Sequence, residues 1–187
     1  MGARRIVPVA KAAWLLAGLL LAAAPASPPG PDREHRVKAV FLFNFAQFVE
    51  WPDSAFAGPD DPLVVGVLGD DPFGDFLDDV VRGEAAGRHP IEIRRFRQPG
   101  EIRKCHILFI APAEASRLEG RIADLGGRRI LTVGESRDFL AQGGMVLFVN
   151  EGGKVRFRIN LEAAQAAGLS LSSKLLRLAG LSGTARD

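Results

Sequence analysis

The stretch LVVGVLGDDPFG, residues 63–74, decides the fold class of this 187-residue chain. Its first seven residues form an apolar run bounded by turn-forming residues, which is typical of a strand buried on both faces of a sheet. The second half predicts a helix over 70–81, with Asp71 as its cap and Pro72 at its first position. A buried strand that leads directly into a helix favours an α/β fold.

Strand-like and helix-like segments continue to alternate after residue 81. The runs IEIRRF (91–96), CHILFI (105–110) and RRILTVG (128–134) predict strands. The segments 114–127 and 136–144 predict helices, and glycines stop the first of them. Strands that alternate with helices in this way are typical of a mostly parallel sheet.

The pattern changes near the C-terminal end, where two strand-like runs follow each other directly. MVLFV (145–149) and KVRFRINL (154–161) flank the glycine-containing connection NEGG (150–153). Two strand-like runs joined by such a short connection predict an antiparallel hairpin.

We therefore expect a single three-layer α/β domain over residues 37–180. It should have a mostly parallel mixed sheet, helices on both faces and the antiparallel hairpin at one edge. The closing helical segment, 161–180, is expected to break near Gly168.

The N-terminal region has the composition of a secretory signal peptide. Basic residues precede the apolar run AAWLLAGLLLAAA (12–24), and small residues follow it. The run is shorter than the roughly 20 apolar residues that a membrane-spanning helix needs. We expect 1–26 to be a cleaved signal peptide, 27–36 a flexible N-terminal segment and 181–187 a tail; an uncleaved anchor is the alternative.

Charge and cysteine content narrow the class of protein further. The chain has 24 basic and 22 acidic residues, and three of the basic residues lie within 1–26, so the exported part is nearly neutral. It has no basic aromatic pattern that predicts nucleic-acid binding. A single cysteine cannot form an intramolecular disulfide, so the domain must be stabilised by its core.

The segment EHRVKAVFLFNFAQFVEWP (34–52) predicts a helix that ends at Trp51-Pro52, because a residue before proline avoids the helical conformation. Apolar residues surround most of its circumference, which is typical of a helix covered on most sides. The alternative is that its aromatic residues form an exposed face for a partner. Phe43, Asn44 and Trp51 are the candidates for such a face.

Further candidates lie on the hairpin and the last helix. Lys154, Arg156 and Arg158 alternate with apolar residues, so they share a strand face that is either a solvated edge or a site for an anion or a partner. Asn44 and Asn160 are polar residues in strongly apolar settings, and each must find a partner or cap a backbone group. The remaining candidates for partner contact are Ser173 and Lys174.

No catalytic, cofactor-binding or metal-binding motif occurs in the sequence. The glycines of VGVLGDDPFG (65–74) do not follow G-x-G-x-x-G, and neither G-K-[ST] nor G-x-S-x-G is present. His35, His89 and His106 lack the spacing of zinc ligands. We therefore expect a binding protein without a cofactor, not an enzyme.

Several segments together resemble the YfiR family of bacterial periplasmic regulators. They are VKAVFLFNFAQFVEWP (37–52), VGVLGDDPFG, CHILFI, ILTVGES, GGMVLFV and VRFRINLEAAQAAGLSLSSKLLRLA (155–179), in that order. The resemblance implies a small periplasmic α/β protein, often dimeric, that represses an inner-membrane diguanylate cyclase or serves another membrane sensor such as a kinase. It also implies an outer-membrane, peptidoglycan-associated protein as a sequestering partner. The implied result is control of cyclic di-GMP, and so of biofilm formation.

Cys105 is the only cysteine, whereas members of this family can carry further cysteines that form disulfides. Because consecutive side chains of a strand point to opposite faces, Cys105 and His106 should diverge and cannot act as a catalytic pair. We expect a buried thiol. The alternative to a protein partner is a small ligand bound where the strands end, near Gly69, Ala111 and Gly134.

Overall fold

The computed structural model describes residues 33–118 and 121–180. The predicted signal peptide, residues 27–32 and the predicted tail lie outside the described residues. Residues 33–36 form the first turn of a helix. None of the helices in the described part of the chain has the length and apolarity needed to cross a bilayer.

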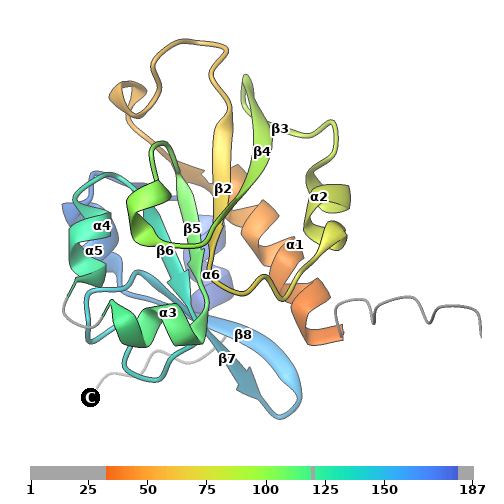
Figure 1. Ribbon diagram of the computed structural model, residues 1–187, viewed down its shortest axis with the longest axis vertical. Helices are drawn as coiled ribbons and strands as arrows, with labels where there is room; N and C mark the ends of the chain where they lie inside the picture. Colours follow the sequence, from red (N-terminus) through yellow and green to blue (C-terminus); the bar gives the residue numbers. More distant parts are fainter. Residues whose placement is uncertain (1–32, 119–120, 181–187) are drawn as a thin grey trace, which may run out of the picture.

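The domain is built on a seven-stranded mixed sheet (Figure 1). Its spatial order is β3-β4-β2-β5-β6-β7-β8, parallel from β4 to β7 and antiparallel at both ends. The five parallel strands follow the order 2-1-3-4-5 of one type of doubly wound sheet. The strands are β2 (Leu63–Leu68), β3 (Ala85–Ala86), β4 (His89–Phe96), β5 (Ile107–Ile110), β6 (Leu131–Gly134), β7 (Val146–Glu151) and β8 (Lys154–Ile159).

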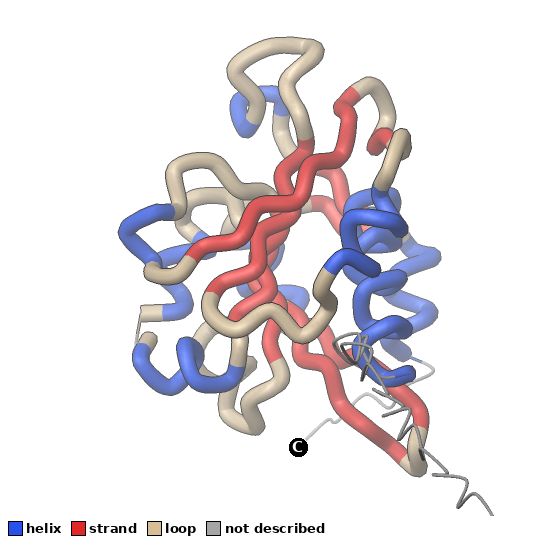
Figure 2. Tube along the Cα trace, turned by 45° about the vertical axis from the view of Figure 1, so that its right-hand side comes forward, coloured by secondary structure: helices blue, strands red, loops and turns tan. Residues whose placement is uncertain are grey.

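Helices cover both faces of this sheet, as Figure 2 shows. Helices α1, α2 and α6 contribute to the core on one face, and α3 and α4 to the core on the other. The predicted three-layer arrangement and the predicted edge hairpin are therefore confirmed. The helices are α1 (Arg33–Phe48), α2 (Asp75–Val81), α3 (Pro112–Arg117), α4 (Ile122–Gly126), α5 (Leu161–Ala166) and α6 (Ser173–Gly180), with short 3₁₀ turns at Asp53–Ala55 and Pro99–Glu101.

The apolar strands divide their side chains between the two cores. In β2 and β5, Val65 and Phe109 enter the core under α1, whereas Leu68 and Leu108 enter the core under α3. This period of two follows from the pleat of a strand. Because both faces are covered, every residue of β2 is buried, as the continuous apolar run predicted.

The predicted helix over 34–52 is wrong in its last residues. Helix α1 ends at Phe48, and Val49–Glu50 form a short strand, β1, that pairs antiparallel with β9 (Ser170–Leu171). Val49 is buried in the core, and a β-branched side chain fits a strand better than a helix end. The predicted break near Gly168 is confirmed, because Gly168 has φ +75° and separates α5 from β9.

Three other boundaries differ from the prediction. The helix expected from residue 70 begins at Asp75, because Asp71 Oδ1 accepts hydrogen bonds from the Phe73 and Gly74 N–H groups and forms a turn first. The single helix predicted over 114–127 is replaced by the two short helices α3 and α4. The segment predicted to be a helix after β6 forms turns, and the Phe139 side chain is buried among them.

Candidate functional site

A charged groove lies between the start of α1 and the β-hairpin. Strand β6 ends at Gly134, opposite Leu147, while β7 continues to Glu151 and carries the hairpin away from the body of the domain (Figure 2). The opening has a volume of about 450 Å³. We call it the hairpin groove, and its lining residues are Glu34, Lys38, Glu135, Arg137, Leu147, Phe148, Val149, Asn150 and Arg158.

Lys38 is the buried charge of the hairpin groove. Its side chain is 4% exposed, and its Nζ lies 2.5 Å from Glu34 Oε1 and 2.9 Å from Glu135 Oε1. Burial opposes the charge of Lys38, but the interactions with the two carboxylates outweigh it and raise the pKa of Lys38. Glu34 precedes Lys38 by one helical turn, whereas Glu135 directly follows β6, so the cluster ties α1 to the sheet.

Asn150 connects the same helix to the hairpin turn. Its Nδ2 donates a hydrogen bond of 2.8 Å to Glu34 Oε2, and its Oδ1 accepts one of 3.0 Å from the Gly153 N–H. Gly152 and Gly153 have φ values of +60° and +75°, as a tight two-residue hairpin turn requires. The turn is therefore held in place from both sides.

Two guanidinium groups complete the electrostatics of the hairpin groove. Arg158 Nη2 donates a hydrogen bond of 3.2 Å to Glu151 Oε1, while Arg158 Nε is buried and makes no hydrogen bond within the described residues. Arg137 is exposed at the rim. Lys38 has two carboxylate partners and Arg158 has one, so Arg137 is the lining cation without an ion pair within the described residues.

A second opening, of about 580 Å³, lies beside the hairpin groove toward the hairpin tip. The two openings share Glu34 and Asn150. The second is lined on the helix side by Val37, which is 38% exposed, and on the hairpin side by Lys154 and Val155. A surface of charged and apolar groups thus runs along the hairpin.

The hairpin arginines singled out from the sequence lie at or near this groove. Arg158 lines it, and Arg156 Nε lies 3.8 Å from Glu151 Oε2, the carboxylate that Arg158 also contacts. Sequence reasoning missed the Lys38 cluster and the rest of the lining. The one local signal was the four-residue spacing of Glu34 and Lys38, because the other lining residues come from distant segments.

Asn160 has a local structural role. Its Oδ1 accepts a hydrogen bond of 3.0 Å from the Ala163 N–H and caps α5, and its Nδ2 donates one of 3.5 Å to the Leu140 carbonyl. The polar side chain is thus satisfied within the domain, which was one of the two roles that the sequence left open.

The candidates on α1 and α6 lie outside the hairpin groove. Lys174 Nζ lies 4.5 Å from the centre of the Phe48 ring, a cation–π contact between the start of α6 and the end of α1. Ser173 Oγ accepts a hydrogen bond from Arg177. The two half-buried candidates on α1 are Phe43, which packs against the core, and Asn44.

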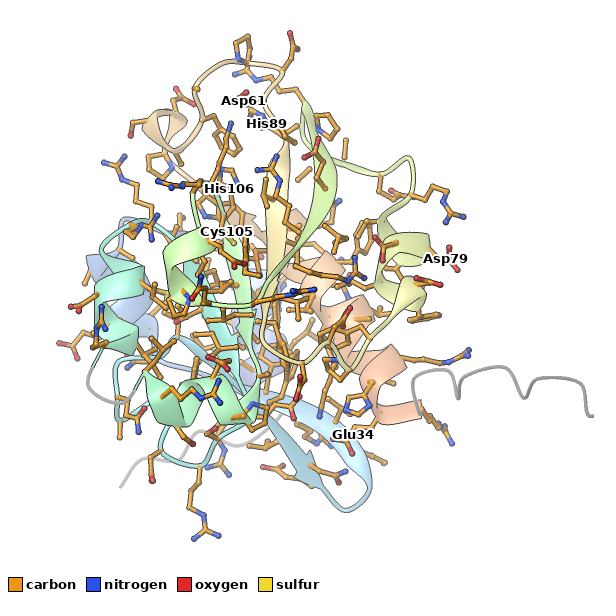
Figure 3. The ribbon with its side chains drawn as sticks, in the orientation of Figure 1. Glu34, Asp61, Asp79, His89, Cys105 and His106 are labelled. Atoms are coloured by element: carbon orange, nitrogen blue, oxygen red, sulfur yellow. The ribbon has the colours of Figure 1, made fainter. Side chains whose placement is uncertain are left out.

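Trp51 belongs to an aromatic stack at the other end of the sheet. Its Nε1 donates a hydrogen bond of 3.1 Å to the Arg129 carbonyl, and its ring meets His106 edge-on. Phe56 is sandwiched between His89 and His106, with ring centres 3.7 and 4.6 Å away. Figure 3 places these histidines at the opposite end of the molecule from the groove residue Glu34.

His106 is buried in the neutral state within this stack. Its Nδ1 accepts a hydrogen bond of 2.9 Å from the Val64 N–H, and its Nε2 donates one of 3.2 Å to the Ala55 carbonyl. Burial lowers the pKa of His106 because a charged imidazolium would lose its hydration. The His106 ring therefore connects the 3₁₀ turn that ends at Ala55 to strand β2.

Cys105 and His106 precede the strand β5, which begins two residues later than predicted. Their side chains diverge as expected. Cys105 packs in the core under α3, where its Sγ lies 3.0 Å from the Ile107 carbonyl oxygen, and burial raises its pKa to about 12. The predicted buried thiol is confirmed.

The sequence left open a small-ligand pocket at the carboxyl ends of the parallel strands. In the structure, side chains of the protein itself fill that space. A Cβ at Gly69 would lie 2.6 Å from Glu114 Cγ, and a Cβ at Gly134 would lie 2.5 Å from Phe139 Cε2. Glu114 and Phe139 are themselves buried, and so is Ala111. The described residues also bring together no group of three acidic, histidine or cysteine side chains that could hold a metal.

The strand order and the helices on both faces of the sheet define a doubly wound domain of the α/β class. The chain matches the YfiR/HmsC-like family over residues 35–180, and it belongs to that family. A comparison with curated proteins finds no significant match. The family is one of periplasmic regulators, not of enzymes, and it points to regulation of diguanylate cyclase signalling through a membrane protein.

Proposed function

We propose that this protein is a non-enzymatic periplasmic regulator that binds and represses the periplasmic part of an inner-membrane signalling protein. The target is a diguanylate cyclase, so binding lowers cyclic di-GMP; a sensor kinase is the alternative target. The observation that carries the proposal is the family match, which spans nearly the whole described domain. The hairpin groove supports it as an open, charged surface suited to a protein partner.

Export and further partners belong to the same proposal. Residues 1–26 direct the chain to the periplasm and are removed after Ala26. An outer-membrane, peptidoglycan-associated protein sequesters the regulator, and two copies associate as a dimer. These partners rest on the family resemblance and not on any contact within the domain.

Deletion of the gene tests the function directly. Cyclic di-GMP should rise in the deletion strain and return to the parental level when the full chain is supplied. A version that lacks residues 1–26 should accumulate in the cytoplasm and fail to restore the level. Immunoblots of both versions control for expression, and an unchanged cyclic di-GMP level in the deletion strain would exclude a cyclase as the target.

A further inference from the structure

Strand β7 has an unpaired edge beside the hairpin groove. β6 accompanies β7 only as far as Gly134 and Leu147, whereas β8 accompanies it to Glu151. From Phe148 onward, no strand of the described chain lies on the β6 side of β7. The accessible part of this edge, Val149–Glu151, extends for about 10 Å at roughly 3.3 Å per residue.

The register shows which main-chain groups face this free side. The Asn160 N–H donates to the Met145 carbonyl, so this pair is hydrogen-bonded across the hairpin. In an antiparallel ladder such pairs alternate with pairs whose main-chain groups point away from each other. Phe148 and Asn150 belong to the second kind, so their main-chain groups point to the β6 side. Phe148 is 3% exposed and adjoins the last β6–β7 pair, so Asn150 presents the accessible main-chain groups of this edge. An exposed edge of this type is a template for an added strand.

The charges beside the edge favour an acidic strand. Arg158 has a buried Nε without a hydrogen-bond partner in the described residues, and Arg137 stands at the rim. Arg158 Nη2 is bonded to Glu151 and Lys38 is held by two carboxylates, so Arg158 Nε and Arg137 are the donors that remain for a partner. A guanidinium matches a carboxylate in geometry and charge. If a second copy of this chain paired with this edge, its arginines would face the arginines of the first copy. The repulsion between like charges disfavours such a dimer.

We propose that an extended acidic segment of the membrane partner binds as an added strand along Val149–Glu151, with a carboxylate at Arg137 and Arg158. This inference rests on the proposed function and specifies how the partner is held. Main-chain hydrogen bonds to β7 provide affinity, and the two arginines select an acidic sequence.

A synthetic peptide tests the docking edge directly. The probe, acetyl-VDVDVDV-amide, is titrated into the isotopically labelled exported protein, and amide chemical shifts are followed by NMR. The shifts should concentrate on β7 and on the lining of the hairpin groove. The matched peptide acetyl-VKVKVKV-amide should bind about tenfold more weakly. Shifts confined to other elements, or equal binding of both peptides, would overturn the proposal.

Two variants of one residue test the main-chain contribution. Asn150→Pro removes an N–H from the free edge, whereas Asn150→Ala removes the same side-chain contacts but keeps that N–H. The proline variant should bind the acidic peptide about tenfold more weakly than the alanine variant. Equal binding would argue against strand addition. Thermal unfolding verifies that both variants are folded. If the proline variant is unfolded, the NMR titration of the natural chain tests strand addition instead.

Charge reversal connects the edge to signalling in the cell. The double change Arg137→Glu and Arg158→Glu should abolish repression of cyclic di-GMP in the deletion strain. Arg94→Glu, on β4, is the matched control with an exposed arginine elsewhere on the sheet. Full repression by the double variant would overturn the inference and leave the proposed function intact. Acidic-peptide binding along β7, together with an unchanged cyclic di-GMP level after deletion, would support the edge and exclude the cyclase as target.

Discussion

Lys38 Nζ lies 2.9 Å from Glu135 Oε1, so a buried cation on the first helix meets a carboxylate that directly follows β6. The contact joins two segments that are far apart in the sequence. It also organises the hairpin groove, because Glu34, the second partner of Lys38, holds Asn150 of the hairpin.

Glu135→Gln should destabilise the domain by about 1–2 kcal/mol, because Lys38 would remain buried and lose one of its two counter-charges. Urea unfolding measures the change. Glu92→Gln is the control, since it removes an exposed carboxylate paired with Arg94 and should cost less than about 0.5 kcal/mol. If Glu135→Gln and Glu92→Gln lower the free energy of unfolding equally, the Lys38 cluster does not stabilise the domain more than an exposed ion pair does.

The free energy of unfolding should fall as the pH drops below about 6.5, the pKa of an unperturbed histidine. Burial lowers the pKa of His106 in the folded state, so the unfolded chain takes up this proton first and acid favours unfolding. Protonation of Nδ1 would also break its hydrogen bond from the Val64 N–H.

Urea unfolding at pH 7 and pH 5.5 measures this effect above the range in which carboxylates titrate. His106→Gln should be less stable than the natural chain at pH 7 and should show a smaller loss between the two pH values. If the natural chain and His106→Gln lose the same free energy of unfolding between pH 7 and pH 5.5, groups other than His106 cause the pH dependence.

Cys105 should be inert in the folded protein, because burial raises its pKa to about 12 and removes it from solvent. A thiol-specific disulfide reagent at pH 8 should label it only after unfolding in urea. Cys105→Ser should leave repression of cyclic di-GMP largely intact. Rapid labelling of the folded protein, or loss of repression by a folded serine variant, would restore a redox role.

Gly66→Ala should destabilise the domain by about 1–3 kcal/mol through overpacking. A Cβ at Gly66 would lie 2.8 Å from Cys105 Sγ and 2.8 Å from Phe96 Cε2. Removal of the sulfur by Cys105→Ala should recover part of the loss in the double variant, because the two residues share one space.

Gly58→Ala is the matched control for this change, because nothing lies within 4 Å of a Cβ at Gly58. It should leave the midpoint of thermal unfolding nearly unchanged. Additive effects of Gly66→Ala and Cys105→Ala would show that the sulfur is not what limits the space.

The sheet was predictable because its strands carry their signal locally. The runs of β2 and β5 are apolar throughout, since both of their faces are covered. The hairpin was equally visible from its glycine turn. By contrast, β1 and β9 have only two residues each, which is too short for a periodicity that a local pattern could reveal. They also lie near opposite ends of the described sequence, so only the fold brings them together.

The candidate site was predictable only in part, for a related reason. Arg158 was found because the hairpin strand alternates, and alternation is a local property. Lys38 looked like one helix cation among apolar residues, and its second carboxylate, Glu135, follows a strand that only the fold brings near. Long-range ion pairs of this kind leave no trace in residue spacing.

The pairing of β1 with β9 has a consequence for how the chain reaches its final form. Val49 finds its partner, Leu171, only after nearly all of the domain has been synthesised. Contacts that close such long loops are slow to form. The seam between β1 and β9 can therefore close only when synthesis of the domain is nearly complete, which makes it one of the last parts of the fold to form.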